Sequence, residues 1–275
     1  MRKGSLNGSE LAGFIKERQA KAVRGLRQAS HVLPRLAIIQ TKDDPVINTY
    51  VRLKKNYGAD ILVDVDVYEI DQSLAKQTIE KLNNDDAVQG IIVQLPLNDI
   101  SETDEILNLV SPSKDVDALG KSPSFDPATP MAIMWLLAGY DVKLEDKLII
   151  IVGQGMLVGA PLYKQLSEAG YDVFVADRNT ENLADVILQA DIIITATGSP
   201  AIIYPEMLKS GAVVVDAGVA SEDGKTVGDL HPTVYDRDDL ILTPTKGGVG
   251  PLTVCALFEN VITSARLTVT ENKSL

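Results

Sequence analysis

The chain has 275 residues, of which 45% are hydrophobic and 23% are charged, and its formal net charge is −12. This length suggests two domains, and the acidic balance argues against nonspecific binding to nucleic acid, whose phosphates attract basic surfaces. With one cysteine, two histidines and no apolar run near the ~20 residues of a membrane helix, we expect a cytoplasmic protein with no disulfide, metal site or membrane partner.

The first half of the chain alternates predicted helices with short apolar strands. In chain order we expect a helix over 9–29, a strand over 36–39, a helix over 46–57, a strand over 61–67, a helix over 72–83 and a strand over 90–93. This alternation is typical of a layered α/β unit with a parallel sheet. An apolar helix from Met131, capped by Thr129 and with Pro130 at its first position, then leads into the second half.

The second half contains the pattern of a Rossmann-like domain. Its predicted strands lie near 148–152, 172–176, 191–195, 213–216 and 240–243, and a last helix covers 252–268. We therefore predict two α/β domains with a cleft between them. The first comprises residues 1–137 plus 252–275, and the second is an NAD(P)-binding domain over 138–251.

A glycine-rich turn after the strand 148–152 is the strongest sign of a dinucleotide site. Its G-x-G-x-x-x-G spacing is one residue longer than the usual fingerprint, and alone it also fits a plain strand–turn–helix joint. Polar residues at the ends of the next two strands favour the cofactor site, because ligands bind at that edge of a parallel sheet. The predicted cofactor-binding residues are Gly153, Gln154, Gly155, Gly159, Asp177, Arg178, Thr197 and Gly198.

Other candidate residues lie in the first half and near the end of the chain. Tyr50 and Lys54 are one helical turn apart, although this spacing alone favours a half-buried tyrosine beside a solvated lysine. Gln94 follows a buried strand, where its carbonyl oxygen can hold a lysine amine. Asp115 and Asp117 place two carboxylates in a loop that is either functional or simply solvated. The glycine loop 247–251 suits close approach of a ligand, or is a flexible connector.

Taken together, these segments resemble the bifunctional methylenetetrahydrofolate dehydrogenase/cyclohydrolase family. They occur in the family's order and span nearly the whole chain. The matching segments are Tyr50-x-x-x-Lys54, Val93-Gln94-Leu95-Pro96-Leu97, Lys114-Asp115-Val116-Asp117, Thr129-Pro130, Val152-Gly153 to Gly159-x-Pro161, Gly228-Asp229 and Gly247-Gly248-Val249-Gly250-Pro251-x-Thr253.

The resemblance implies oxidation of 5,10-methylenetetrahydrofolate with NAD(P)⁺ and hydrolysis of the methenyl product to 10-formyltetrahydrofolate, within one-carbon metabolism and purine biosynthesis. It implies that Lys54 is the catalytic lysine, that Gln94 orients it and that Tyr50 packs on the folate. It also implies that Asp117 binds the pterin ring, that substrate contacts Gly247, Gly248 and Pro251, and that the chain forms a homodimer through the cofactor domain.

The chain departs from the family pattern at several positions. Ile47 replaces a serine, Ala118 a glycine and Ala128 a cysteine, Gln154-Gly155 replace Arg-Ser, and Thr245-Lys246 replace Val-Pro. Three alternatives therefore stay open: a dehydrogenase with weak or no cyclohydrolase activity, a folate- or nucleotide-binding homologue without turnover, and a dehydrogenase of another small acid. The Val-Gln-Leu-Pro-Leu and Lys-Asp-Val-Asp segments argue against the third.

Cofactor choice depends on two neighbouring residues. Asp177 can accept from a ribose 2′-hydroxyl and repel a 2′-phosphate, whereas Arg178 can pair with that phosphate. The position of Arg178 matches the family's phosphate contact, so we expect NADP, with NAD possible.

Overall fold

The computed structural model describes residues 4–222 and 225–272. Its contacts divide the chain into two compact units. One, which we call the three-stranded unit, comprises Gly13–Ala128 and Val254–Leu275; the other, the five-stranded unit, comprises Met1–Ala12 and Thr129–Thr253. Two of the boundaries between the units, at 12/13 and 253/254, lie inside the first and the last helix, and the third lies at 128/129. The sequence-based expectation had placed the domain boundaries at 137/138 and 251/252.

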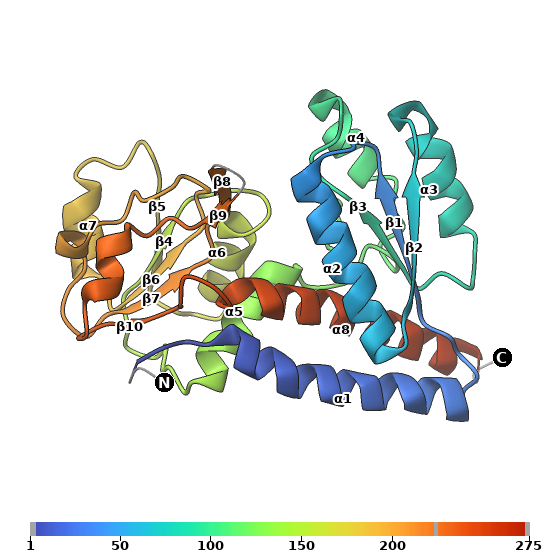
Figure 1. Cartoon of the computed structure of the whole chain (residues 1–275), viewed down its shortest axis with the longest axis horizontal. Helices are drawn as coiled ribbons and strands as arrows, with labels where there is room; N and C mark the ends of the chain where they lie inside the picture. Colours follow the sequence, from blue (N-terminus) through green and yellow to red (C-terminus); the bar gives the residue numbers. More distant parts are fainter. Residues whose placement is uncertain (1–3, 223–224, 273–275) are drawn as a thin grey trace. The chain divides into compact units, whose positions relative to one another are not determined.

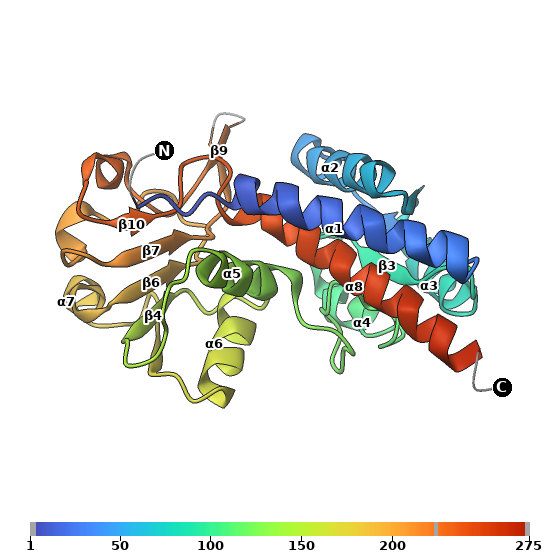
Figure 2. The ribbon, with the colours of Figure 1, turned by 90° about the horizontal axis from the view of Figure 1, so that it is seen from below.

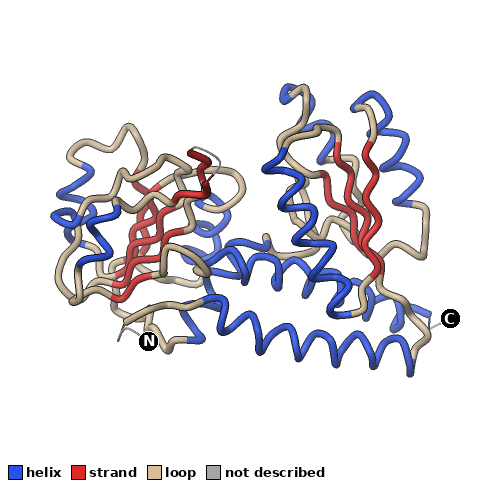
Figure 3. Tube along the Cα trace, in the orientation of Figure 1, coloured by secondary structure: helices blue, strands red, loops and turns tan. Residues whose placement is uncertain are grey.

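The three-stranded unit is a parallel sheet with helices on both faces (Figures 1 and 3). The strand order is β2-β1-β3, and β1 pairs in parallel with both neighbours. The elements are α1 (Gly8–Ala29), which begins in the other unit, β1 (Arg35–Gln40), α2 (Pro45–Ile61), β2 (Asp64–Glu69), η1 (Gln72–Leu74), α3 (Ala75–Asn83), β3 (Gly90–Val93), η2 (Ile100–Glu102) and α4 (Thr103–Leu107).

The strand predicted over 61–67 is displaced by the end of the preceding helix. Ile61 is the last residue of α2, and Leu62 takes a left-handed conformation with φ 66° that caps it. Such a C-cap closes the last helical turn, so the extended chain begins only at Asp64. Apolar periodicity does not locate this boundary, because Ile61 at the end of the helix and Val63 before the strand are both buried.

Apolar residues of the sheet and α3 form the core of this unit. The cluster joins Ala37 and Ile39 of β1, Ile91 and Val93 of β3, and the buried face of α3. The parts of α1 and α8 that belong to this unit run side by side (Figure 2), where Gln19 donates to the backbone oxygen of Cys255 at 2.8 Å.

The five-stranded unit is a parallel sheet in the order β10-β7-β6-β4-β5. From β4 the chain steps to β5 on one side and then to β6 on the other. This reversal makes a topological switch point, where ligands bind at the carboxyl ends of the strands. The elements are α5 (Ala128–Gly139), β4 (Ile149–Val152), α6 (Gly159–Glu168), β5 (Val173–Ala176), α7 (Leu183–Gln189), β6 (Ile192–Thr195), η3 (Pro205–Met207), β7 (Val213–Asp216), β8 (Ala220–Glu222), β9 (Lys225–Val227), η4 (Pro232–Asp236) and β10 (Ile241–Leu242).

Two features of this unit differ from the sequence-based expectation. The helix expected from Met131 begins at Ala128, so that Thr129 and Pro130 lie inside its first turn. The antiparallel pair β8–β9 was not predicted, because these strands are three residues each and the apolar pattern that marks buried strands does not extend to them.

The chain ends in α8 (Val249–Asn272), which is unusually apolar. Among the described residues it is the one helix long and apolar enough to cross a membrane by length and composition, over Val249–Thr270. More than half of that stretch is buried inside the fold, as expected for the core helix of a globular protein.

Candidate active site

Lys54 and Gln94 meet in the three-stranded unit. Lys54 lies on α2, and Gln94 follows the last residue of β3, at the carboxyl edge of the sheet. The Lys54 ammonium donates a 2.8 Å hydrogen bond to Gln94 Oε1, and Gln94 Nε2 donates to the backbone oxygen of Leu95 at 3.0 Å. The predicted pairing of a lysine with a strand-end glutamine is therefore present.

Charge and burial both act on Lys54. Burial lowers the pKa of its ammonium group, and the nearby carboxylate of Asp117 opposes this effect. Burial also raises the pKa of the Asp117 carboxyl, while Lys54 opposes that shift. Burial thus acts against the charged form of both groups, and each charge partly offsets this effect on the other. Tyr50, one turn before Lys54, is 36% exposed and is available to a ligand.

The loop that carries Asp117 is shaped by a second carboxylate. Asp115 is 5% exposed, and its oxygens accept from the backbone N–H groups of Leu119 at 3.3 Å and Gly120 at 2.8 Å. Asn260 of α8 donates to the backbone oxygen of Val116 at 2.9 Å. The loop is therefore held from within and by the last helix, and Asp115 is a structural residue.

Ala118 is in a strained part of this loop. Its φ of 57° lies in the left-handed region, which disfavours a Cβ atom. We expect Ala118→Gly to raise the free energy of unfolding by about 0.5–1 kcal/mol, the cost of a left-handed alanine less the chain entropy of the new glycine. Urea denaturation measures this change. Ala22→Gly, in the middle of α1, serves as the control and should be destabilising; loss of stability in both variants would contradict the prediction.

In the five-stranded unit, the glycine turn after β4 is packed closely. Gly153 has φ 106°, and a Cβ on it would lie 2.7 Å from the backbone oxygen of Ala196. A Cβ on Gly159 would lie 1.9 Å from the backbone oxygen of Gly153, whereas one on Gly155 would meet nothing within 4 Å. The turn therefore needs glycine at its two ends for packing, and its middle faces open space that a ligand can enter. Gln154 is exposed beside Gly155.

Polar residues follow the two strands on either side of β4. At the end of β5, Asp177 Oδ1 accepts from the backbone N–H of Asn179 at 2.8 Å, and Arg178 is exposed. At the end of β6, Gly198 has φ 65°, and Thr197 Oγ1 accepts from the backbone N–H of Ser199 at 3.0 Å. The predicted cofactor residues thus all lie at the carboxyl edge of this sheet, at its switch point.

The glycine loop before α8 is fixed by the start of the chain. The Ser9 N–H donates to the backbone oxygen of Gly247 at 2.9 Å, and Gly247 has φ 81°. A Cβ on Gly8 would lie 1.8 Å from the backbone oxygen of Gly248. These contacts overturn the alternative of a flexible connector, and Pro251 follows in the first turn of α8.

Two models of one protein family match the chain. The tetrahydrofolate dehydrogenase/cyclohydrolase catalytic domain matches residues 6–117, and the NAD(P)-binding domain of the same family matches residues 127–269. The chain belongs to the tetrahydrofolate dehydrogenase/cyclohydrolase family. The bifunctional protein FolD of Lactobacillus acidophilus is 35% identical over 274 residues, covering 95% of this chain and 96% of that protein.

Solved structures of the tetrahydrofolate dehydrogenase/cyclohydrolase family share the fold. The bifunctional enzyme FolD of Campylobacter jejuni has a TM-score of 0.88 and 35% identity, covering 95% of this chain and 98% of that one. The enzyme of Trypanosoma brucei, solved with NADP and an inhibitor, has a TM-score of 0.89 and 28% identity, covering 96% and 98% of the two chains.

Membership in the tetrahydrofolate dehydrogenase/cyclohydrolase family confirms the resemblance, the two-domain α/β fold with parallel sheets, and the expectation of an enzyme with both activities. The catalytic-domain match contains β1 to β3, and the NAD(P)-binding match contains β4 to β10. The alternative of a dehydrogenase for another small acid is therefore wrong. The assignment of individual site residues stays a prediction.

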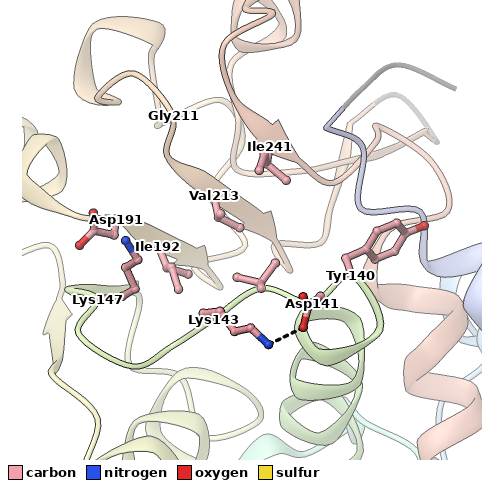
Figure 4. Close-up of a pocket in the computed structure, with 10 residues that line it drawn as sticks. Tyr140, Asp141, Lys143, Lys147, Asp191, Ile192, Gly211, Val213 and Ile241 are labelled. Atoms are coloured by element: carbon pink, nitrogen blue, oxygen red, sulfur yellow. Dashed lines mark hydrogen bonds and ion pairs between the residues drawn. The ribbon is translucent and has the colours of Figure 1, made fainter.

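A pocket of about 240 Å³ in the five-stranded unit lies apart from the residues assigned above (Figure 4). It is lined by residues at the amino ends of β6 and β7, the edge of the sheet opposite to the glycine turn. Among its charged residues, Lys143 pairs with Asp141 at 2.5 Å, and Asp191 pairs with Lys209 of the same unit at 2.8 Å. We therefore assign it no part in the reaction of this family.

Proposed function

We propose that the protein oxidises 5,10-methylenetetrahydrofolate to the 5,10-methenyl cation with NADP⁺, and hydrolyses that cation to 10-formyltetrahydrofolate. Its place is one-carbon metabolism, in which the formyl product serves purine biosynthesis. The observation that carries this proposal is the Lys54–Gln94 hydrogen bond beside Asp117, because it provides a desolvated amine at the edge of a sheet. The tetrahydrofolate substrate contacts Tyr50, Asp117 and the glycine loop with Gly247, Gly248 and Pro251.

The residues around the glycine turn fit a dinucleotide. The turn at the switch point offers a backbone with open space at Gly155, and Asp177, Arg178 and the Thr197–Gly198 loop surround it along the same sheet edge. A nicotinamide cofactor held there would supply the hydride acceptor. The protein's task in this step is to align the substrate carbon with the cofactor, which requires no protein nucleophile.

Cyclohydrolysis makes a different demand on the protein. A water must lose a proton as it attacks the methenyl cation. As the ring then opens, the new hydroxyl group loses its proton and a ring nitrogen gains one, so that one proton is released overall. A lysine whose pKa is lowered by burial gives up its proton more readily than an exposed lysine, and its neutral amine can accept the proton from the water and return it to the ring nitrogen. Gln94 holds the amine in place through its carbonyl oxygen, and Asp117 binds the pterin.

One assay separates the candidate functions. The absorbance of methenyltetrahydrofolate is followed together with formyl-product formation, using NAD⁺ and NADP⁺ in parallel. Formyl product supports the bifunctional enzyme. Accumulation of the methenyl compound instead supports a dehydrogenase with weak cyclohydrolase activity, and absence of any signal supports a binding protein without turnover.

Arg178 provides a test of cofactor choice. We expect Arg178→Ala to raise the KM for NADP⁺ more than the KM for NAD⁺, because only NADP⁺ carries the 2′-phosphate that the guanidinium contacts. Steady-state kinetics with both cofactors measures the ratio. Lys164→Ala, at an exposed position on α6, is the control for loss of a surface cation. Equal increases in KM for the two cofactors would show that Arg178 does not contact the 2′-phosphate.

Asp117 should influence the pH profile of the cyclohydrolase step. Its negative charge raises the pKa of Lys54, so Asp117→Asn should lower that pKa further. The catalytic amine is active as a base when neutral, and the acid limb of the kcat profile should therefore move to lower pH. Rates at saturating methenyltetrahydrofolate measure kcat apart from the expected rise in KM. An acid limb that stays in place or moves to higher pH would contradict the proposed effect of Asp117 on the pKa of Lys54.

We further propose a cytoplasmic homodimer, with no nucleic acid or membrane partner. Strand β5 is at one edge of the five-stranded sheet, and its Phe174 side chain is 56% exposed. An edge strand with an exposed aromatic residue is suited to pairing with a second copy. Sedimentation of the wild type and of Phe174→Glu measures this: a wild-type monomer would contradict the proposal.

A further inference from the structure

The Gly228-Asp229 segment matches the family pattern but has no part in the steps above. It follows β9 in the five-stranded unit. Asp229 is 0% exposed, and its Oδ2 accepts a 2.7 Å hydrogen bond from the backbone N–H of Thr197. Among residues 4–222 and 225–272, its Oδ1 atom is buried and has no hydrogen-bond partner. Burial of a carboxyl group with one unpartnered oxygen lowers stability, so the position of Asp229 calls for an explanation.

Asp216, the last residue of β7, holds the chain around Asp229 in place. Its Oδ1 accepts from the Thr195 hydroxyl at 3.1 Å and from the backbone N–H of Asp229 at 3.1 Å. Its Oδ2 accepts from the backbone N–H of Leu230 at 3.1 Å. Asp216 therefore ties the Asp229 segment to the ends of β6 and β7.

Two glycines make room for the two carboxyl groups. A Cβ on Gly218 would lie 2.0 Å from Asp229 Oδ1, and a Cβ on Gly228 would lie 2.1 Å from Asp216 Oδ2. Both carboxyl groups thus lie directly against backbone that no larger residue can occupy. The hydrogen bonds of Asp216 and the close packing of Gly218 therefore fix the position of Asp229 independently of its bond to Thr197.

The loop that Asp229 contacts belongs to the proposed cofactor site. Thr197 and Gly198 follow β6 at the carboxyl edge of the sheet, and the neighbouring Ala196 packs closely against Gly153 of the glycine turn. We propose that Asp229 is a positioning residue for the nicotinamide cofactor, which fixes the Thr197–Gly198 loop through its carboxyl oxygen. This inference rests on the proposed NAD(P) site at that edge.

The protonation state of Asp229 agrees with this role. Burial raises the pKa of the Asp229 carboxyl, and the nearby Asp216 carboxylate raises it further, while the hydrogen bonds from Thr197 and Thr195 act in the opposite direction. Burial thus acts against the charged form, and the backbone N–H of Thr197 needs an acceptor oxygen from Asp229 rather than a negative charge. Asparagine has that oxygen at the same reach.

Two substitutions of Asp229 test the proposal. Asp229→Ala removes the acceptor and should raise the dissociation constant for NADPH at least tenfold, as measured by NADPH fluorescence titration. Asp229→Asn keeps the acceptor and should bind NADPH within about threefold of the wild type. Cyclohydrolysis of supplied methenyltetrahydrofolate needs no hydride acceptor, and both variants should keep it within twofold. Asp238→Asn, which removes an exposed acid of the same unit, is the surface control.

The outcomes decide between the inference and the proposed function. Wild-type affinity in Asp229→Ala, or equal weakening in the Ala and Asn variants, would overturn the positioning role while the proposed function stands. Failure of the wild type to bind NADPH or to oxidise methylenetetrahydrofolate would instead overturn the proposed function. Circular-dichroism melting checks folding; if Asp229→Ala does not fold, Asp229→Ser, which fills more of the space but does not reach Thr197, replaces it with the same expected tenfold loss.

Discussion

Lys54→Met should abolish the cyclohydrolase activity and leave part of the dehydrogenase activity. Methionine keeps most of the length and apolar stem of lysine but has no amine, so the water attacking the methenyl carbon has no proton acceptor. A lost general acid–base group lowers a rate by about 10² to 10⁴-fold. Hydride transfer depends on alignment rather than on proton transfer. Methenyltetrahydrofolate should therefore accumulate.

Absorbance of the methenyl compound and formation of the formyl product measure this split in the wild type and the variant. Lys55→Met is the matched control, because Lys55 is the next residue on α2 and its side chain is exposed. It should retain both activities. If Lys54→Met opened the methenyl ring at the wild-type rate, Lys54 would not be the catalytic base, and the site assignment would fail at its centre.

Gly159→Ala should weaken both the fold and cofactor binding. The new Cβ would lie 1.9 Å from the backbone oxygen of Gly153, a distance at which the glycine turn or the start of α6 must move. Overpacking of this kind costs about 1–3 kcal/mol. Because the moved backbone is the turn that we assign to the cofactor, NADPH affinity should fall by about tenfold or more, which corresponds to 1.4 kcal/mol.

Thermal unfolding and NADPH fluorescence titration measure the two effects. Gly155→Ala is the matched control for stability, since a Cβ at Gly155 meets nothing within 4 Å; its melting temperature should stay near that of the wild type. If the ligand enters the space beside Gly155, this control should still weaken NADPH binding. A Gly159→Ala variant with unchanged stability and affinity would contradict the close packing of the turn.

The alternation of strands and helices was predictable because buried strands are short, β-branched and apolar. The strand predicted over 148–152 corresponds to β4, and that over 90–93 to β3. Boundaries that depend on backbone conformation were not predictable, as the left-handed cap at Leu62 shows. The N-terminal segment was not predicted to join the five-stranded unit, because its contacts with residues 242 and 247 lie more than two hundred residues away in sequence.

For the candidate site, spacing and family resemblance together predicted that Lys54 and Gln94 meet, although spacing alone favoured a solvated lysine. The structural role of Asp115 was not predictable, since it shares one loop with Asp117 and only the fold buries it against the backbone of Gly120. The role proposed for Asp229 was not predictable either, because its partner Thr197 lies 32 residues away in the sequence.

Each unit joins segments that lie far apart in the sequence, and this bears on synthesis at the ribosome. The five-stranded unit needs Ser5 to pair with Leu242 and Ser9 to bind Gly247, while the three-stranded unit needs Asn260 to bind the backbone of Val116. The five-stranded unit therefore completes these contacts only after residue 247 has emerged, and the three-stranded unit only after residue 260. Such long-range contacts form slowly, and the nascent chain exposes unfinished apolar sheets during translation. We therefore expect the growing chain to be more prone to aggregation before α8 has been synthesised than after it.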